Sequence, residues 1–214
     1  KHQTGVIKVM KPLHSFVMLT LALCPICQAH AGQKKLADFT DSNTLRWKTV
    51  NDNVMGGRSK GSFAISKNAT LLFKGKTSLR NNGGFSSIRT DRQMLGLKNY
   101  KGLALRVRGD GRVFKMTLRT SNTSRWINFW AEFPTIAGEW QEIRIPFNQF
   151  FATSFGSKRR NKLSVDKIDS IGFMIYDKKA GKFSLEVSKI NAYNDIPTTK
   201  QNIVEVASNA GVFK

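Results

Sequence analysis

Cysteine and histidine are scarce in this chain of 214 residues, which has two cysteines and three histidines. All of them lie in the first 31 residues, so the rest of the chain has neither residue type. That stretch therefore lacks a Ser-His-Asp triad, a Cys-His nucleophile, a disulfide and the His or Cys ligands of a zinc site. Acid–base catalysis would depend on carboxylates or lysines, and a metal would need oxygen ligands, as Ca²⁺ and Mg²⁺ do.

Acidic residues are also few: 14 Asp and Glu stand against 35 Lys and Arg, and the net charge is +21. Such a surplus favours anionic partners. Acidic polysaccharide, an envelope protein with an acidic surface and nucleic acid all carry the required charge. Charge alone does not distinguish them, because lysine and arginine attract phosphate without regard to sequence.

The N-terminal stretch carries an apolar run of 12 residues, 16–27. A membrane-spanning helix takes about 20 residues, so this run is too short to cross a bilayer. With lysines before it and Ala29-His30-Ala31 after it, the run is typical of a secretory signal peptide. We therefore predict a signal peptide over residues 1–31, with the natural start at Met10, and a periplasmic or secreted protein. Export disfavours nucleic acid as the partner.

Aromatic residues are plentiful, and 15 Phe with 4 Trp argue against an intrinsically disordered chain. From about residue 45 to residue 193, short segments alternate between apolar and polar residues and are bounded by Gly, Asn and Asp. The predicted strands are 62–66, 69–74, 85–90, 103–108, 112–119, 126–133, 141–146, 170–176 and 183–190. Nine short strands without a competing helical pattern predict an all-β sandwich.

The last residues differ in pattern from the strands. Residues 202–214 place Ile203, Val206, Ala207 and Ala210 on one face of an amphipathic helix. This segment resembles the opening helix of a fasciclin-like domain. We therefore expect a β-sandwich domain over 32–195, followed over 196–214 by a linker and the first helix of a truncated fasciclin-like domain. The alternative is a C-terminal helix that docks on the sandwich.

Asp110-Gly111 predicts a two-residue hairpin between the strands 103–108 and 112–119. In that register Arg106 lies opposite Lys115 on the face turned away from the core. Like charges directly opposite each other destabilise a sheet, so an anionic ligand or acidic neighbours are needed there.

The next strands add indoles and further polar groups to the same face. We predict one water-facing sheet surface that binds an anionic partner through guanidinium forks and stacking indoles. Its candidate residues are Arg106, Arg108, Lys115, Arg119, Trp126, Asn128, Trp130, Glu132, Trp140 and Arg144. Two alternatives stay open. Arg106 and Lys115 could simply pair with Glu132 and Glu142 while loops cover the indoles, or those two glutamates could be the carboxylate pair of a glycoside hydrolase.

Four stretches, 47–59, 73–89, 102–112 and 171–187, resemble the complex I intermediate-associated protein (30 kDa) family. The signature residues are Asn51, Asp52, Asn53, Met55, Gly56, Gly57, Asn82, Gly83, Gly84, Phe85, Gly109, Asp110 and Gly111. The resemblance implies a galactose-binding-like jelly-roll β-sandwich without enzymatic activity. It also implies an assembly factor or chaperone for respiratory complex I (NADH:ubiquinone oxidoreductase) or another membrane complex.

The turn Asn51-Asp52-Asn53 is rich in oxygen ligands and is followed by Gly56-Gly57. It could hold a structural Ca²⁺, or its side chains could close an Asx turn without a metal. No other cofactor is predicted. The residues favour a non-catalytic, secreted binding module for an anionic polysaccharide or envelope protein. The alternative, from the resemblance, is an assembly factor whose partner is an assembly intermediate of a membrane complex.

Overall fold

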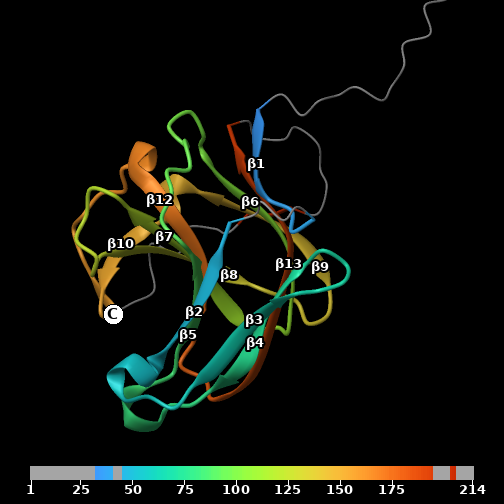
Figure 1. Cartoon of the computed structure of the whole chain (residues 1–214), viewed down its shortest axis with the longest axis vertical. Coiled ribbons are helices and arrows are strands. Elements are labelled where there is room, and N and C mark those ends of the chain that lie inside the picture. The colour runs from blue at the N-terminus through green and yellow to red at the C-terminus, as the bar shows by residue number, and fades with distance from the viewer. Residues whose placement is uncertain (1–31, 41–44, 195–202, 206–214) are drawn as a thin grey trace, which may run out of the picture. The chain divides into compact units, whose positions relative to one another are not determined.

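The chain is described by a computed structural model, which covers residues 32–40, 45–194 and 203–205 (Figure 1). Two sheets of seven strands each enclose one hydrophobic core, which confirms the predicted all-β sandwich. Within these described residues no helix is long and apolar enough to cross a membrane.

The first sheet has the strand order β14-β9-β6-β13-β4-β3, with β1 paired to β13. Its strands are β1 (Gln33–Ala37), β3 (Lys60–Ile65), β4 (Leu71–Thr77), β6 (Gly102–Gly109), β9 (Trp140–Pro146), β13 (Gly181–Tyr193) and β14 (Ile203–Glu205). All its pairs are antiparallel except β14 with β9.

The second sheet has the order β11-β10-β8-β7-β12-β5-β2 and is antiparallel throughout. Its strands are β2 (Trp47–Asn51), β5 (Ser86–Thr90), β7 (Val113–Thr120), β8 (Asn128–Pro134), β10 (Phe151–Ser154), β11 (Ser157–Lys158) and β12 (Ile168–Ile175). Four single turns of 3₁₀ helix connect strands: η1 (Asp52–Met55), η2 (Arg80–Asn82), η3 (Phe147–Gln149) and η4 (Val165–Lys167).

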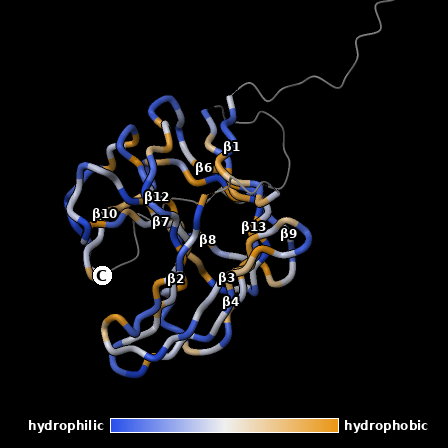
Figure 2. Tube along the Cα trace, viewed as in Figure 1, coloured by the Kyte–Doolittle hydropathy of each residue, from blue (hydrophilic) through white to orange (hydrophobic). Residues whose placement is uncertain are grey.

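The alternation of apolar and polar residues along the predicted strands correctly indicates which side chains lie in the core. Leu103, Leu105 and Val107 of β6 and Phe114 and Met116 of β7 are fully buried. Figure 2 shows hydrophobic residues alternating with hydrophilic ones along the strands. Because each inward side chain packs on the opposite sheet, the period of two alone identifies the core face.

The Asp110-Gly111 segment does not form the predicted hairpin. β6 pairs with β9 and β13, whereas β7 pairs with β8 and β12, so the chain crosses from one sheet to the other here. Gly111 has a φ of 87°, and a Cβ on Gly109 would lie 2.3 Å from the Oγ1 atom of Thr135. A hairpin and a crossing show the same alternation, because both send their apolar side chains into one core.

The C-terminal segment also departs from its prediction. Ile203–Glu205, predicted as part of an amphipathic helix, form β14 beside β9. The rest of the predicted helix lies outside the described residues. Strands β1, β2, β10 and β11 were not predicted, because they are short and rich in polar residues.

Candidate functional site

The predicted sheet surface is divided between the two sheets, so the expectation of one shared face is wrong. The outer face of the first sheet carries four of the candidates, Arg106, Arg108, Trp140 and Arg144. The outer face of the second sheet carries five others, Lys115, Arg119, Asn128, Trp130 and Glu132. Trp126 lies in the turn before β8. The physical reason is the crossing at Asp110-Gly111, which sends β6 and β7 into different sheets.

Two of these candidates on the first sheet, Arg106 and Arg108, already have acidic partners. Arg106 donates to Glu142 at 3.2 Å and Arg108 to Glu186 at 2.5 Å. Both guanidinium groups lie over the Trp140 ring, at 5.5 and 5.0 Å from its centre. This arrangement matches the alternative in which Arg106 simply pairs with an acidic neighbour.

Lys115 is also engaged, because it forms an ion pair with Glu132 and lies 5.6 Å from the Trp130 ring centre. Glu132 and Glu142 therefore lie on the outer faces of opposite sheets, and each is bound to a cation. A glycosidase needs its two carboxyl groups within about 10 Å on either side of one bond. The structure thus excludes the predicted carboxylate pair.

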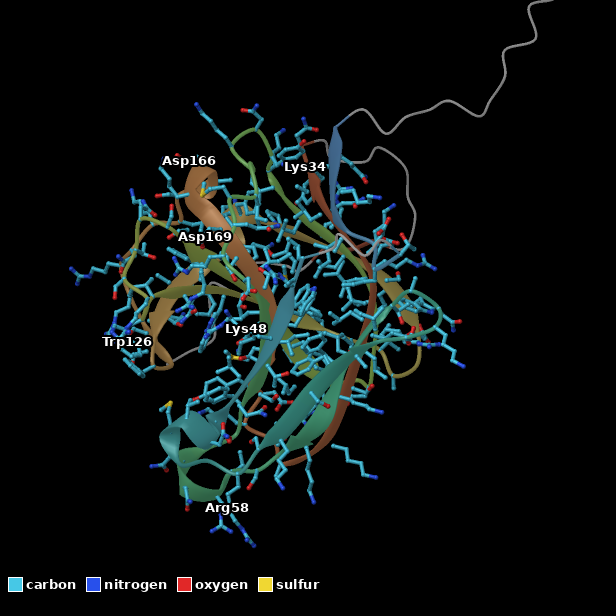
Figure 3. The ribbon with its side chains drawn as sticks, viewed as in Figure 1. Lys34, Lys48, Arg58, Trp126, Asp166 and Asp169 are labelled. Carbon is cyan, nitrogen blue, oxygen red and sulfur yellow. The ribbon has the colours of Figure 1, made fainter. Side chains whose placement is uncertain are left out.

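The outer face of the second sheet is hollowed into a cleft of about 510 Å³. Its central strands contribute the short side chains Ser87, Thr117 and Ser170, which leave room between larger neighbours. Of the predicted candidates, the cleft brings together four, Arg119, Trp126, Asn128 and Trp130. Figure 3 shows Trp126 at the periphery of the molecule.

Positive charge is concentrated in this cleft. Three arginines, Arg89, Arg119 and Arg125, line it, and none of the described residues that line it is acidic. The Nε atoms of Arg89 and Arg119 are buried without a hydrogen-bond partner. The carboxylate of Asp169 near them is paired with Arg92 at 3.0 Å.

Burial and neighbouring positive charges lower the pKa values of two of these arginines. Burial, with repulsion from Arg89 and Arg92, lowers the pKa of Arg119 to about 10. Burial and the charge of Arg92 lower the pKa of Arg89 as well. Both groups stay protonated at neutral pH, and Asp169 offsets only part of their charge, so the cleft holds a surplus of positive charge that an anion would stabilise.

Large apolar side chains are exposed around the mouth of the cleft. Val54 is 69% exposed and Met55 59% on one side, and Phe155 is 68% and Trp126 50% exposed on another part of the lining. The Trp126 and Phe155 rings lie 5.3 Å apart. Exposed apolar side chains gathered at a concave site are typical of a binding surface.

The family signature supports the wall of this cleft. Asp52 is buried at the start of η1, and its carboxylate accepts hydrogen bonds from Ser59 N (2.8 Å), Ser59 Oγ (2.6 Å) and Gly84 N (2.7 Å). A Cβ on Gly57 would lie 2.3 Å from the Asp52 side chain, and one on Gly83 2.5 Å from it. Only glycine allows this approach, which fixes η1, with Met55, against the loop of η2.

The carboxylate oxygens of Asp52 therefore already accept hydrogen bonds from protein donors. Within the described part of the chain, no group of three or more Asp, Glu, His or Cys residues is placed to hold a metal ion. The Ca²⁺ hypothesis stays a prediction, and this carboxylate is not free to support it. The remaining signature residues Asn51, Asn53, Gly56, Asn82 and Phe85 lie in or beside the same two turns, and Gly109, Asp110 and Gly111 lie at the crossing.

Stability is expected to fall in acid through Asp52. Burial raises its pKa, but the hydrogen bonds from Ser59, Gly84 and Phe85 outweigh burial and leave the pKa below its ordinary value of 3.8. A carboxyl with a lowered pKa in the fold contributes stability above about pH 4, and this contribution is lost as pH falls through the folded value. Urea unfolding at a series of pH values should show this decline. Asp52→Asn should flatten it, and equal slopes for both proteins would contradict the assignment.

Sequence reasoning missed several residues of the cleft, among them Arg89, Met174 and Phe155. Arg89 and Met174 point outward on predicted strands, and their alternation could have revealed them if the order of neighbouring strands had been known. Phe155 follows β10, which the pattern did not predict.

The fold is that of the carbohydrate-binding-module jelly roll. A family 11 carbohydrate-binding module of the cellulosomal cellulase Lic26A-Cel5E of Clostridium thermocellum superposes with a TM-score of 0.59 at 18% identity, covering 78% of this chain and 96% of the module. A family 30 module of the cellulase Cel9D-Cel44B of the same organism gives a TM-score of 0.51 at 13% identity, covering 77% and 99%. The predicted galactose-binding-like jelly-roll β-sandwich is confirmed.

The sequence family is equally clear. Residues 37–187 match Complex I intermediate-associated protein 30 (CIA30), and the chain belongs to this family. It is 33% identical over 178 residues to the mouse protein named Complex I intermediate-associated protein 30, mitochondrial, with 73% of this chain and 54% of the mouse protein aligned. A Caenorhabditis elegans relative is 32% identical over 160 residues, with 65% and 47% aligned. The chain thus spans about half the length of these relatives.

The predicted periplasmic or secreted localisation is wrong. The mouse, Caenorhabditis elegans and Drosophila melanogaster relatives are all named as mitochondrial proteins. The signal peptide expected over residues 1–31 was the basis of that prediction, and these residues lie outside the described part of the chain. The fasciclin-like resemblance of the last residues gains no support from these matches.

Proposed function

We propose that this chain is a non-catalytic binding module that acts as an assembly factor, holding an intermediate of complex I through an acidic, partly apolar segment of that intermediate. The observation that carries the proposal is the pair of half-buried arginines, Arg89 and Arg119, without acidic partners in the cleft. The names of the relatives, which describe them as intermediate-associated proteins of complex I, support the choice of partner.

The chemistry of the cleft suits a protein segment. A charge that is partly removed from water is costly unless a counter-charge reaches it. A carboxylate can accept two parallel hydrogen bonds from one guanidinium group, which matches the fork of arginine. Exposed Val54, Met55, Trp126 and Phe155 then offer apolar contacts around that ion pair. Arginine, methionine and aromatic residues are the types enriched at the centres of protein interfaces.

The test uses complex I assembly intermediates solubilised from mitochondrial membranes and immobilised wild-type chain. We expect the double variant Arg89→Gln/Arg119→Gln to bind them at least about tenfold more weakly, because two hydrogen bonds to charged groups are lost. The matched control is Arg106→Gln/Arg108→Gln, which removes the same charge from the opposite sheet, and it should bind like the wild type. Equal binding by the cleft variant, or equal loss in both, would contradict the proposal.

An acidic polysaccharide is the second candidate ligand. It is favoured by the half-exposed Trp126, whose ring has the Arg125 guanidinium 4.5 Å from its centre, a platform that suits an acidic sugar. Trp130, the other indole of the cleft, is only 8% exposed and offers little ring surface for stacking. Calorimetric titration of the same two variants with polygalacturonate separates this candidate from the protein segment.

A further inference from the structure

The outer face of the first sheet carries a second cationic surface, away from the arginine cleft. Lys76 of β4 lies directly opposite Lys60 of β3 and Lys182 of β13, so three lysines form one row across three strands. All three are exposed. We call Lys60, Lys76 and Lys182 the lysine row.

The lysine row is destabilising as it stands. Like charges directly opposite each other on neighbouring strands repel, and strands in a sheet lie about 4.8 Å apart. In the part of the chain that the structure describes, none of the three lysines forms an ion pair. An anionic ligand that reaches all three ammonium groups would relieve this repulsion.

The nearby carboxylates offset the charge of the row only in part. Asp110 accepts hydrogen bonds from Ser184 N at 2.8 Å and Arg112 N at 3.2 Å. Glu186, further along β13, binds Arg108 and accepts a hydrogen bond from Thr70 at 2.6 Å. Glu186 is thus paired with Arg108, whereas Asp110 lines the same groove as four lysines and its charge can offset only one of them.

The surroundings of the row define what it can bind. Together with Lys74 and the hydroxyls of Ser62 and Ser184, it lines an open groove of about 700 Å³. Among the described residues that line this groove, the one aromatic residue, Phe183, is buried, so they offer single-stranded nucleic acid no stacking platform.

We propose that the lysine row docks the chain on an anionic lipid bilayer. A bilayer presents a plane of phosphate groups, and ammonium groups on one sheet face can meet several of them without any fixed geometry. This docking is independent of the partner in the cleft, because the two surfaces lie on opposite sheets. A module that binds a protein with one sheet and a membrane with the other would bring its partner to the lipid surface.

Vesicle sedimentation tests the docking. The full chain is mixed with vesicles of phosphatidylcholine alone, or of phosphatidylcholine and phosphatidylglycerol at about three to one. We expect binding to the anionic vesicles only, weakening steeply as salt is added. Each lysine near a membrane contributes about fivefold, so Lys60→Ser/Lys76→Ser/Lys182→Ser should weaken partitioning by about a hundredfold.

A matched control distinguishes an effect of the lysine row from an effect of the lower net charge. Lys67→Ser/Lys98→Ser/Lys162→Ser removes three exposed lysines from three different loops and should weaken binding far less. The row variant should also unfold at the same or a higher urea concentration, because the repulsion is relieved. Equal loss in both variants, absence of binding to anionic vesicles, or binding only to inorganic polyphosphate or duplex DNA would overturn the proposal.

Discussion

Replacing Asp52 with alanine is expected to lower the free energy of unfolding by about 3 kcal/mol or more. The substitution leaves the backbone N–H groups of Ser59 and Gly84, and the hydroxyl of Ser59, without their shared acceptor in a buried site. Each unsatisfied buried donor costs about 1–3 kcal/mol, and part of that cost is relieved when η1 rearranges. Urea unfolding followed by tryptophan fluorescence measures the loss.

Two controls show whether the loss comes from the network. Asp166→Ala removes an exposed carboxylate whose ion-pair partner is the neighbouring Lys167, and should change stability by less than about 0.5 kcal/mol. Asp52→Asn keeps one acceptor oxygen and should fall between the wild type and Asp52→Ala. A loss of less than about 1 kcal/mol for Asp52→Ala would show that η1 is held by other contacts.

The core could be predicted from the sequence, and the pairing of strands could not. Alternation alone identified Leu103, Leu105 and Val107 as inward residues, because the side-chain period of a strand does not depend on its neighbours. Which strands lie side by side depends on contacts far apart in sequence. The Asp110-Gly111 crossing gives the same local pattern as a hairpin, so the predicted surface joined Arg106 to Lys115, which belong to different sheets.

The candidate site, like the strand pairing, could be predicted from the sequence only in part. Arg119, Trp126, Asn128 and Trp130 were predicted and do line the cleft. Arg89 was missed because β5 reaches the cleft through β12, a neighbour from a distant part of the sequence. The signature glycines Gly57 and Gly83 leave no room for a Cβ beside the side chain of Asp52. The sequence does not reveal that Asp52 is their neighbour, because it lies 32 residues before Gly84. Only the three-dimensional structure shows this contact.

Arg112→Ala is expected to lower the free energy of unfolding by about 3–5 kcal/mol, the range for breaking a buried ion pair. Its guanidinium group meets Asp177 through two hydrogen bonds, Nη2 to Oδ1 at 2.5 Å and Nε to Oδ2 at 2.9 Å. It also donates to the carbonyl oxygens of Lys179 at 2.7 Å and Lys182 at 2.9 Å. Because the side chains of Arg112 and Asp177 are only 12% and 7% exposed, water cannot fully replace these bonds.

A double-mutant cycle with Asp177→Ala separates the pair from its surroundings. If the two groups act together, the double variant should be much less destabilised than the sum of the single variants. Arg112→Lys should recover little, because an ammonium group cannot reproduce the fork that meets Asp177 and two carbonyls. The exposed pair Arg106–Glu142, with both side chains 49% exposed, is the matched comparison, and its cycle should give less than about 1 kcal/mol. Similar coupling in the two cycles would contradict the prediction that the buried Arg112–Asp177 pair contributes more to stability than an exposed pair.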